Sequence, residues 1–398
     1  MEPSDIACHA LTPQGADLAR RIATALHGTV YLPRRFAQDG EHAFDALTPH
    51  LAATFRAHSG HVFIAAAGIV VRGLAPLLGR KDTDPAVVVC DQHGAYAISL
   101  LSGHLGGAND LARHVAHITG GHAVITTATD TAGLPSLDMA ARDAGCAIRN
   151  LGAVKAINGA LLEGRPVMLF DPQDRLGLAR HVAGQDAAGD ENAKASRTDE
   201  DSAAHDDRPD GGPTTGVDDA DAAPATRVSA SHAPLFRCVA DLDTLLALPH
   251  DVACVAVTWR DIPGTRSRLV LHPPVIHAGI GCRRGAGVEA VARLLDEALR
   301  MAGAASHSLA ALHTVDIKGD EPALHAVAAA RDVRLHCHAA ASLAAIEVPN
   351  PTPKAAEVLG TGPVGVCEAA AILGSGGGRL LVEKMKGDGV TVALALRP

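Results

Sequence analysis

Short apolar strands that run through a glycine into a helix recur along this chain, and this pattern constrains its fold more than any other feature. Residues 61–68 (HVFIAAAG) form an apolar run that ends in glycine, and residues 69–78 continue as a helix. Near the start, Thr12 and Pro13 are suited to begin a helix, and a short strand follows it at residues 29–32. This alternation of strands and helices predicts α/β architecture.

The length of 398 residues is too great for one compact core and indicates several domains. We predict an N-terminal α/β domain over residues 1–148 and a small middle α/β domain over residues 149–182 and 234–270. A C-terminal α/β domain follows over residues 271–398. The segment 183–233 interrupts the middle domain. It is rich in Asp, Ala, Gly, Thr and Pro and nearly lacks large apolar side chains, so we predict a disordered insert there.

The negative charge of the chain is concentrated in this insert. Between Asp186 and Arg227 there are twelve acidic and four basic residues, which account for −8 of the net charge of −9. The remainder is nearly neutral and shows no basic patch of the kind that binds nucleic acid. Aromatic residues make up only 2% of the chain, so platforms for stacking single-stranded bases are scarce. We therefore expect no nucleic-acid partner.

Nothing in the sequence indicates a membrane or an oxidising compartment. The longest apolar run, residues 62–71, is ended by Arg72 and falls short of the roughly 20 residues that a membrane helix needs. The first residues include Glu2 and Asp5 and lack the basic start of a signal peptide. The eight cysteines form no C-x-x-C pair, which is typical of reduced thiols. We expect a soluble cytoplasmic protein without a membrane partner.

The loop at residues 102–110 (SGHLGGAND) joins a strand to a helix and is the first candidate site. Its glycines allow the backbone to approach a ligand, and the free N–H groups that start the helix favour a carboxylate or phosphate. His104 is suited to general acid–base catalysis, or it simply faces solvent. A tight turn capped by Asn109 and Asp110 is the alternative for the whole loop. The candidate ligand-binding residues are Ser102, Gly103, Gly106, Gly107 and Asn109.

A second polar motif, TTATD at residues 126–130, follows the short strand at residues 123–126. Thr126, Thr127 and Asp130 are candidates for holding a polar substrate or orienting a water, and a local side-chain turn is the alternative. If the strands that precede the two motifs are parallel, both motifs emerge at the same edge of the sheet. Ligands bind beyond strand ends in open α/β sheets.

The third motif, GIGCRRGAG at residues 279–287, again joins a strand to a helix. Gly279 and Gly281 are candidate substrate-binding positions, and Arg283 and Arg284 are suited to clamp acidic groups. An exposed structural turn is the alternative for the two arginines. Cys282 has no histidine partner nearby in the sequence, so we interpret it as a buried spectator thiol.

Three further patterns include residues that could act on a ligand. Glu368 lies at the start of an Ala-rich helix, where it faces a cleft or merely favours the helix dipole. Lys384 is a candidate substrate-binding residue that shares one strand face with Lys386, and an ordinary solvated edge is the alternative. His336 and His338 also share a strand face, but no obvious third ligand accompanies them, so we predict no metal site.

Five stretches carry a resemblance to a known family. They are LLSGHLGGAND (100–110), VITTATD (124–130), GIGCRRG (279–285), GVCEAAAIL (365–373) and EKMKGDGVTVALA (383–395). In this order the chain resembles the CbiG family of cobalamin biosynthesis over nearly its whole length outside the insert. Residues 315–321 fit less well and look closer to CobE, a stand-alone homologue of the C-terminal part.

The resemblance implies an activity. The family's substrate is a ring-contracted cobalt corrinoid with many carboxylates, whose δ-lactone is opened with release of acetaldehyde. The cobalt belongs to this tetrapyrrole substrate, so no separate cofactor is implied. On this basis we expect His104, Asp130 and Glu368 to be catalytic, with His104 as the base. The backbone N–H groups near Gly106 and Gly107 are the expected oxyanion donors.

Two other classes of function remain to be separated from this one. A corrinoid-binding or carrier protein of the CobE type would bind the tetrapyrrole without releasing acetaldehyde. A plain nucleotide-binding protein is disfavoured, because no phosphate-loop lysine and no complete dinucleotide fingerprint is present. A homodimer, and a transient contact with neighbouring methyltransferases of the pathway, stay open as protein partnerships.

Overall fold

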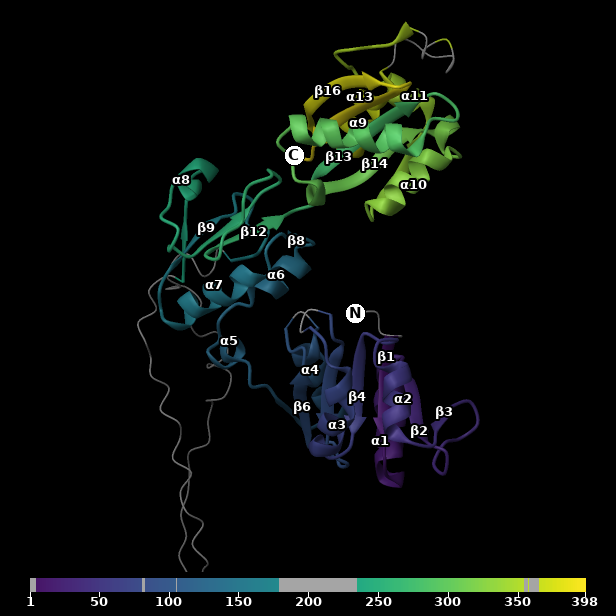
Figure 1. Cartoon of the computed structure of the whole chain (residues 1–398), viewed down its shortest axis with the longest axis vertical. Helices are drawn as coiled ribbons and strands as arrows, with labels where there is room; N and C mark the ends of the chain where they lie inside the picture. The colour runs from purple at the N-terminus through teal and green to yellow at the C-terminus, as the bar shows by residue number, and fades with distance from the viewer. Residues whose placement is uncertain (1–4, 81–82, 105, 179–234, 354–356, 358–364) are drawn as a thin grey trace, which may run out of the picture.

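The computed structural model describes residues 5–80, 83–104, 106–178, 235–353, 357 and 365–398. Within these residues the chain forms three sheets with helices packed on them, which Figure 1 shows as three bodies. The predicted class, three α/β domains, is confirmed. The predicted disordered insert at residues 183–233 lies outside the described residues.

The described strands of the N-terminal domain form a sheet in the order β3-β2-β1-β4-β5-β6-β7. The first five run parallel: β1 (Ile6–Ala10), β2 (Thr29–Pro33), β3 (His42–Phe44), β4 (Gly60–Ile64) and β5 (Ala86–Cys90). Two run the opposite way: β6 (Tyr96–Leu101) and β7 (His122–Val124). Helices α1 (Pro13–Leu26) and α4 (Ala108–Thr119) pack on one face of the sheet. Helices α2 (Leu47–Thr54) and α3 (Ala67–Leu74) pack on the other face. A short 3-10 helix, η2 (Ala75–Leu77), follows α3.

Local sequence signals explain the main elements of this domain. The hydroxyl of Thr12 accepts a hydrogen bond from the Gly15 N–H at 3.1 Å, which caps α1 as predicted. A hairpin turn joins β5 to β6. The Asp91 carboxylate accepts from the N–H groups of His93 (2.8 Å) and Tyr96 (2.6 Å), and this holds the turn between β5 and β6. The chain therefore reverses, and β6 ends at the edge of the sheet where β5 begins.

The middle domain has its described strands in the order β10-β9-β11-β12-β8. They are β8 (Ala147–Ile148), β9 (Val167–Phe170), β10 (Phe236–Cys238), β11 (Cys254–Val257) and β12 (Arg268–His272), with β8 antiparallel to the rest. Helices α6 (Leu137–Asp143) and α7 (Gly152–Leu162) pack on one face and α8 (Leu242–Leu246) on the other; α5 (Ala128–Thr131) precedes α6. Leu137 and Ala141 are buried in this core, so the packing changes before Leu137 and not at residue 148, where we placed the boundary. The apolar stripe of α6, which we did not recognise, is the reason.

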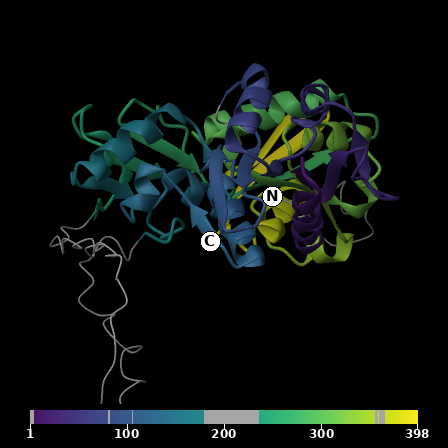
Figure 2. The same cartoon turned by 90° about the horizontal axis from the view of Figure 1, so that it is seen from below.

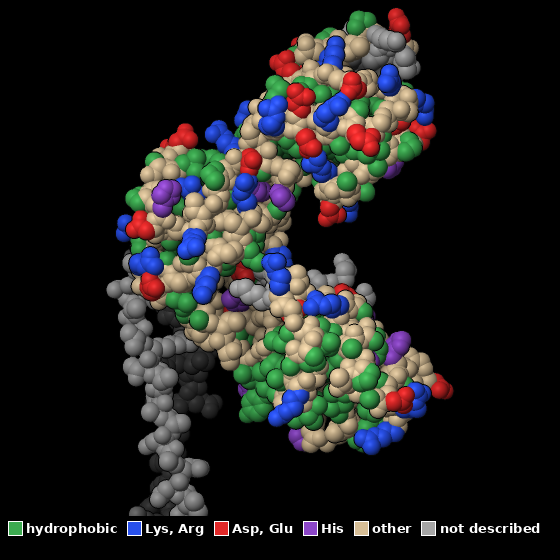
Figure 3. Space-filling view, in the orientation of Figure 1, with side chains coloured by type: hydrophobic (Ala, Val, Ile, Leu, Met, Phe, Trp, Pro, Cys, Tyr) green, Lys and Arg blue, Asp and Glu red, His purple; other side chains and the backbone are tan. Residues whose placement is uncertain are grey.

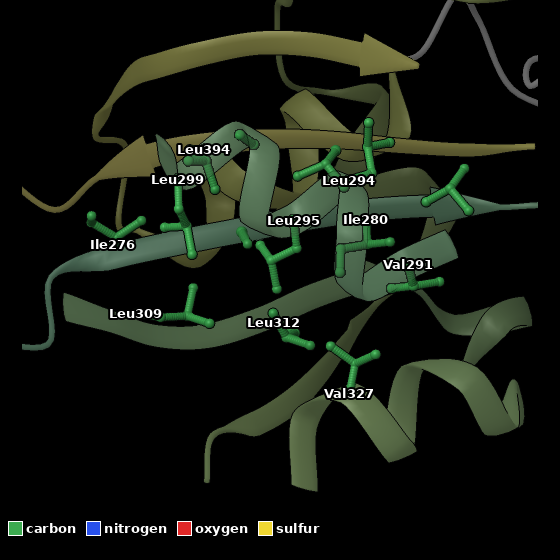
Figure 4. Packing of buried hydrophobic residues seen from close by; sticks show 14 of the residues in the cluster. Ile276, Ile280, Val291, Leu294, Leu295, Leu299, Leu309, Leu312, Val327 and Leu394 are labelled. Atoms are coloured by element: carbon green, nitrogen blue, oxygen red, sulfur yellow. The ribbon is translucent and has the colours of Figure 1, made fainter. Parts of the chain in front are cut away.

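The C-terminal domain has its described strands in the order β15-β14-β13-β17-β16. They are β13 (Ile276–Cys282), β14 (Leu309–Val315), β15 (Arg334–His338), β16 (Arg379–Gly387) and β17 (Val390–Leu396), with β17 antiparallel to its neighbours. The helices are α9 (Val288–Met301), α10 (Pro322–Ala330), α11 (Ala340–Ala344) and α13 (Val366–Gly374), with 3-10 turns η4 (Ser306–Ser308) and η5 (Asp316–Lys318). Val291 and Leu295 of α9 pack against Ile280 and Leu312 of the sheet (Figure 4).

The middle domain lies to one side of the other two. In Figure 3 an open hollow separates the N-terminal from the C-terminal domain, and Figure 2, seen from below, shows these two domains one beneath the other. The edge of the N-terminal sheet where β1 begins lies near the chain end labelled N in Figure 1 and faces this hollow. Among the described residues, no helix combines the length and the apolar character required to span a bilayer.

Buried histidines connect neighbouring elements of the N-terminal domain. His50 Nε2 lies 3.1 Å from His9 Nδ1, and His9 Nε2 lies 3.0 Å from His61 Nδ1. His61 Nε2 lies 3.0 Å from the carbonyl oxygen of Phe55. Because a carbonyl only accepts, each imidazole donates through Nε2 and accepts through Nδ1, and the three rings are neutral. Burial lowers the pKa of His50 and His61 to about 4 and that of His9 well below its ordinary value.

Acid is expected to destabilise the N-terminal domain. The unfolded chain protonates His61 near the ordinary pKa of 6.5, whereas the folded domain does so only near a pKa of about 4. The unfolded state therefore binds more protons in between, so the free energy of unfolding is highest above pH 6.5 and falls as the pH decreases. Urea denaturation at about pH 7.5 and about pH 5 measures the difference, and we expect a loss of about 2 kcal/mol from His61 alone. The same free energy of unfolding at both pH values contradicts the neutral network. The control is the replacement of the exposed His122 by alanine, which should leave the difference between the two pH values as it is in the wild type.

Gly279 is expected to be needed for packing. A Cβ at this position of β13 would overlap the carbonyl oxygen of Cys367 in α13, so the helix would have to move away from the sheet. We expect Gly279→Ala to lower the free energy of unfolding by about 1–3 kcal/mol. The matched control is Gly159→Ala in α7, where a Cβ meets nothing within 4 Å and a helix gains from alanine. Chemical denaturation of both variants checks this, and equal stabilities would show that the helix is free to shift.

Candidate active site

The two polar motifs of the N-terminal domain meet at one edge of its sheet. They follow β6 and β7, which pair in parallel. This is the condition under which we expected both motifs to emerge at the same edge. His104 Nε2 lies 2.9 Å from Asp130 Oδ2 and 3.1 Å from the Thr129 hydroxyl. The structure thus brings together two of the three residues that we predicted to be catalytic.

Hydrogen bonds hold the Asp130 carboxylate in place and keep it ionised. Oδ2 accepts from the Thr127 hydroxyl at 2.7 Å and from Asn109 Nδ2 at 3.0 Å, and Oδ1 accepts from Arg113 at 2.6 Å. Burial raises the pKa of Asp130, but the hydrogen bonds from Thr127, Arg113 and His104 outweigh burial and leave that pKa below its ordinary value. Asn109 is fixed in turn, because its carbonyl oxygen accepts from Ser99 at 2.7 Å.

This arrangement leaves one basic nitrogen on His104. Because ionised Asp130 only accepts, Nε2 of His104 carries the proton and Nδ1 carries the lone pair. Nδ1 lies 3.9 Å from Asp138 Oδ2, beyond hydrogen-bond distance. Asp138 belongs to α6 of the middle domain, and its other oxygen accepts from the Ser136 hydroxyl and the Met139 N–H. The free nitrogen of His104 therefore points towards the middle domain.

A cavity of about 260 Å³, here called the His104 cavity, has His104 in its lining. It is lined by residues of the loop, of α4 and of the segment that leads through α6. Its carboxylates, Asp110, Asp130 and Asp143, outnumber its single guanidinium group, Arg113. The cavity is thus suited to stabilising positive charge on an imidazole and is poorly suited to binding several carboxylates of a ligand.

The glycines of the loop shape its backbone. Gly107 has φ +85°, and its N–H donates to the His104 carbonyl at 2.7 Å. This N–H is therefore not available as the oxyanion donor that we expected. A Cβ at Gly106 would overlap Ser102, and one at Gly103 would lie 2.8 Å from Asn109 Oδ1. The Ser102 hydroxyl donates to the Asp84 carbonyl at 2.9 Å and anchors the loop, while Thr126 is exposed.

Glu368, the third residue predicted to be catalytic, lies fully buried in the C-terminal domain. Oε1 accepts from Asn350 Nδ2 at 2.9 Å and from the Lys384 N–H at 3.0 Å, and Oε2 accepts from the Asn350 N–H at 3.2 Å. The Lys384 ammonium donates to the Asn350 carbonyl and, at 3.0 Å, to the Thr352 hydroxyl. Glu368 and Lys384 together hold residues 350–352 against β16, and in the described part of the chain no contact joins them to His104.

The remaining candidates of the C-terminal domain make structural contacts. Arg284 forms an exposed ion pair with Asp320 at 2.9 Å, and the Arg283 N–H donates to the Gly389 carbonyl at 2.9 Å. A Cβ at Gly281 would lie 2.6 Å from the Thr391 hydroxyl oxygen. Burial raises the pKa of the half-buried Cys282 thiol, which disfavours a nucleophilic thiolate.

Some site residues were missed by the sequence analysis. Arg113 stands four residues after Asn109 on α4, a spacing that places both on one helix face, and this signal was available. Asp138 comes from another domain, and no local pattern indicates it. Within the described residues, no three His, Cys, Asp or Glu side chains converge in a way that could hold a metal ion.

Comparison with known proteins divides the chain in the same way as the structure. A model of the cobalamin synthesis G N-terminal region matches residues 49–130, a cobalamin biosynthesis central region matches residues 135–273, and a cobalamin synthesis G C-terminus matches residues 276–395. The cobalt-precorrin-5A hydrolase of Salmonella typhimurium is 31% identical over 402 residues, which cover 100% of this chain and 99% of that protein. The one from Priestia megaterium is 28% identical over 407 residues, 99% of this chain and 95% of that protein. Protein CobE from Sinorhizobium is 35% identical over 118 residues, 29% of this chain and 77% of its own length.

The chain is a protein of three α/β domains, and its full-length relatives are named as hydrolases. The chain belongs to the CbiG family of cobalamin biosynthesis and is a hydrolase of that family. The resemblance seen in the five sequence stretches is confirmed.

Glu368 is expected to stabilise the C-terminal domain. In Glu368→Gln an amide NH₂ would face the N–H donors of Asn350 and Lys384, which now donate to a carboxylate. We expect a loss of about 1.5–3 kcal/mol in the free energy of unfolding, measured by urea denaturation. Glu289→Gln, at an exposed glutamate of α9, is the matched control and should change stability little. Wild-type stability in Glu368→Gln would show that the carboxylate is not held for structural reasons.

Proposed function

We propose that this protein is a cobalt-precorrin-5A hydrolase, which opens the δ-lactone of a ring-contracted cobalt corrinoid and releases acetaldehyde to give cobalt-precorrin-5B. The observation that carries the proposal is the 31% identity to the Salmonella typhimurium hydrolase over practically the full length of both chains. The cobalt is carried by the substrate. Hydrolysis needs only water and proton transfer, so no separate cofactor is invoked.

In the proposed reaction, His104 Nδ1 removes a proton from a water that attacks the lactone carbonyl carbon. The acyl–oxygen bond then breaks, which leaves a carboxylic acid on the macrocycle and an alkoxide on the two-carbon fragment. The alkoxide becomes the carbonyl of acetaldehyde as the adjacent carbon–carbon bond breaks, and the electron pair of that bond returns to the macrocycle, which takes up the proton held by the His104 imidazolium. Asp130, 2.9 Å from Nε2, stabilises the imidazolium that forms in the first step.

The developing oxyanion requires hydrogen-bond donors in the same place. Among the described residues the Gly106 N–H has no hydrogen-bond partner, so it remains the candidate donor of this loop. The Gly107 N–H is occupied by the His104 carbonyl. The proposal therefore keeps Gly106 and drops Gly107 from the donor role.

A carrier function of the CobE type is the second candidate. It is supported by the 35% identity to Protein CobE, but that similarity spans 29% of the chain, in its C-terminal region. The His104–Asp130 site belongs to the N-terminal domain, and a carrier has no need for a base paired to a carboxylate.

The direct test is to incubate the purified protein with cobalt-precorrin-5A and to measure acetaldehyde through NADH oxidation by alcohol dehydrogenase. Stoichiometric, enzyme-dependent acetaldehyde supports the hydrolase. Tight binding of the corrinoid without acetaldehyde supports the carrier and removes the catalytic roles proposed here.

His104→Ala is expected to lower kcat by about 10²–10⁴-fold, because the loss of a general base removes that much acceleration. Corrinoid binding should persist, since the His104 cavity contributes little to holding carboxylates. His93→Ala, at an exposed histidine in the turn before β6, is the matched control and should keep the wild-type rate. Full turnover by His104→Ala eliminates the proposed base.

A further inference from the structure

A second cavity lies between the middle and C-terminal domains and takes no part in the chemistry proposed for His104. It has a volume of about 490 Å³ and is here called the interdomain cavity. Asp171 and Thr258, which follow the carboxyl ends of β9 and β11, line one side of it. Arg379 and Leu396, at the start of β16 and the end of β17, line the other. In open α/β sheets ligands bind beyond the carboxyl ends of parallel strands.

Four arginines contribute to this cavity, two from each domain: Arg175, Arg260, Arg379 and Arg397. Within the described residues, none of their guanidinium groups donates a hydrogen bond or forms an ion pair with a carboxylate. Arg260 lies over the ring of Trp259, 5.6 Å from its centroid. Elsewhere in the chain, exposed arginines such as Arg34 and Arg284 are paired with aspartates.

The carboxylates of the interdomain cavity do little to neutralise these arginines. Asp171 accepts from the N–H groups of Arg175 (3.0 Å) and Leu176 (2.9 Å). Asp241 caps α8, accepting from the N–H of Thr244 at 2.7 Å and from its hydroxyl at 3.0 Å. Both side chains are thus turned to their own backbone. The exposed Asp243 is the remaining carboxylate of the lining.

The rest of the lining is largely apolar. Phe170, Leu242, Val257 and Leu396 contribute side chains, together with Trp259, the only tryptophan of the chain. An apolar wall bordered by unpaired guanidinium groups fits a large, flat molecule with carboxylates at its periphery. Inorganic phosphate or a small dicarboxylate would leave the apolar wall uncovered.

The two walls are joined by hydrogen bonds close to the cavity. The Asp261 N–H donates to the Gly303 carbonyl at 2.8 Å, and the Ala305 N–H donates to the Trp259 carbonyl at 2.9 Å. Trp259 itself packs against the C-terminal core. The cavity is therefore formed before any ligand binds, which reduces the entropy lost on binding.

We propose that the interdomain cavity binds the peripheral carboxylates of a polycarboxylate macrocycle through Arg175, Arg260, Arg379 and Arg397. The inference rests on the proposed function, because the corrinoid substrate is the ligand that brings such carboxylates, and it assigns their binding to a place other than the acidic His104 cavity. Guanidinium groups are suited to this task since they bind carboxylates in a bidentate manner.

The test is calorimetric titration of the full chain with cobyrinic acid, a cobalt corrinoid whose peripheral side chains are free carboxylic acids. The methyl ester of cobyrinic acid, in which every carboxylate is masked, is the ligand control. The variants are the double substitution Arg379→Gln/Arg397→Gln and, from the opposite wall, Arg260→Gln. Arg300→Gln, at an exposed arginine of α9 in the same domain, is the protein control.

We expect the Kd for cobyrinic acid to rise at least about tenfold for each arginine removed and to rise with salt, while Arg300→Gln leaves it unchanged. Binding of the ester should be weak and the same in all variants. Absence of binding of cobyrinic acid to the wild-type protein, or equal Kd values in the wild type, Arg260→Gln and the double variant, overturns the proposal.

The acetaldehyde assay separates this inference from the proposed function. Acetaldehyde release together with arginine-independent binding of cobyrinic acid would reject the proposed binding site and support the hydrolase. Arginine-dependent binding without acetaldehyde release supports the binding site and removes the hydrolase. In an active protein, the double variant should raise KM for the corrinoid far more than it lowers kcat, which a merely structural role would not do.

Discussion

The candidate site depends on the reversal of the chain at the turn between β5 and β6. The Asp91 carboxylate holds this turn through the N–H groups of His93 and Tyr96. Because β6 runs against β5, and β7 runs with β6, the loops after both strands lie where the parallel strands begin. The bond from the Ser102 hydroxyl to the Asp84 carbonyl, just before β5, fixes this position. That edge adjoins the middle domain, so Asp138 of α6 can approach His104. A parallel β6 would carry the loop to the opposite edge.

The electrostatics of the two cavities explain why catalysis and anion binding would be separated in the proposed scheme. A base that accepts a proton becomes a cation, and the carboxylates around His104 stabilise that charge. An arginine cluster placed there would oppose protonation of His104 at the moment the water is activated. The carboxylates of a corrinoid would be repelled by Asp110 and Asp143 if they entered the same cavity. A protein that must do both tasks with one ligand gains from placing them on different domains.

The sequence predicted those parts of the fold whose signals are local. The helices at residues 108–119 and 288–301 have strong apolar periodicity and glycines before their first turns, and both follow the loops after which the sequence predicts a helix. His104 and Asp130 could be paired because the strands before them end at one edge. Asp138 could not be found, since its approach depends on how two domains pack. Gly279 has a structural reason that the sequence does not reveal, because a glycine that admits a helix backbone has the same local signature as one that admits a ligand. The hydrogen bonds that Glu368 accepts from Asn350 and Lys384 depend likewise on tertiary packing, and no local pattern indicates them.

Trp259 has a consequence for the evolution of this gene. A region similar to the C-terminal part exists in Sinorhizobium as Protein CobE, of which the match covers 77%. In the present chain Trp259 partly covers the C-terminal core, and its carbonyl accepts a hydrogen bond from the Ala305 N–H. If a gene came to encode the C-terminal domain alone, its protein would expose the apolar side chains that Trp259 now covers and leave the Ala305 N–H to water. Separation of the two domains would therefore select for polar replacements of these apolar side chains, or for a partner protein that covers them.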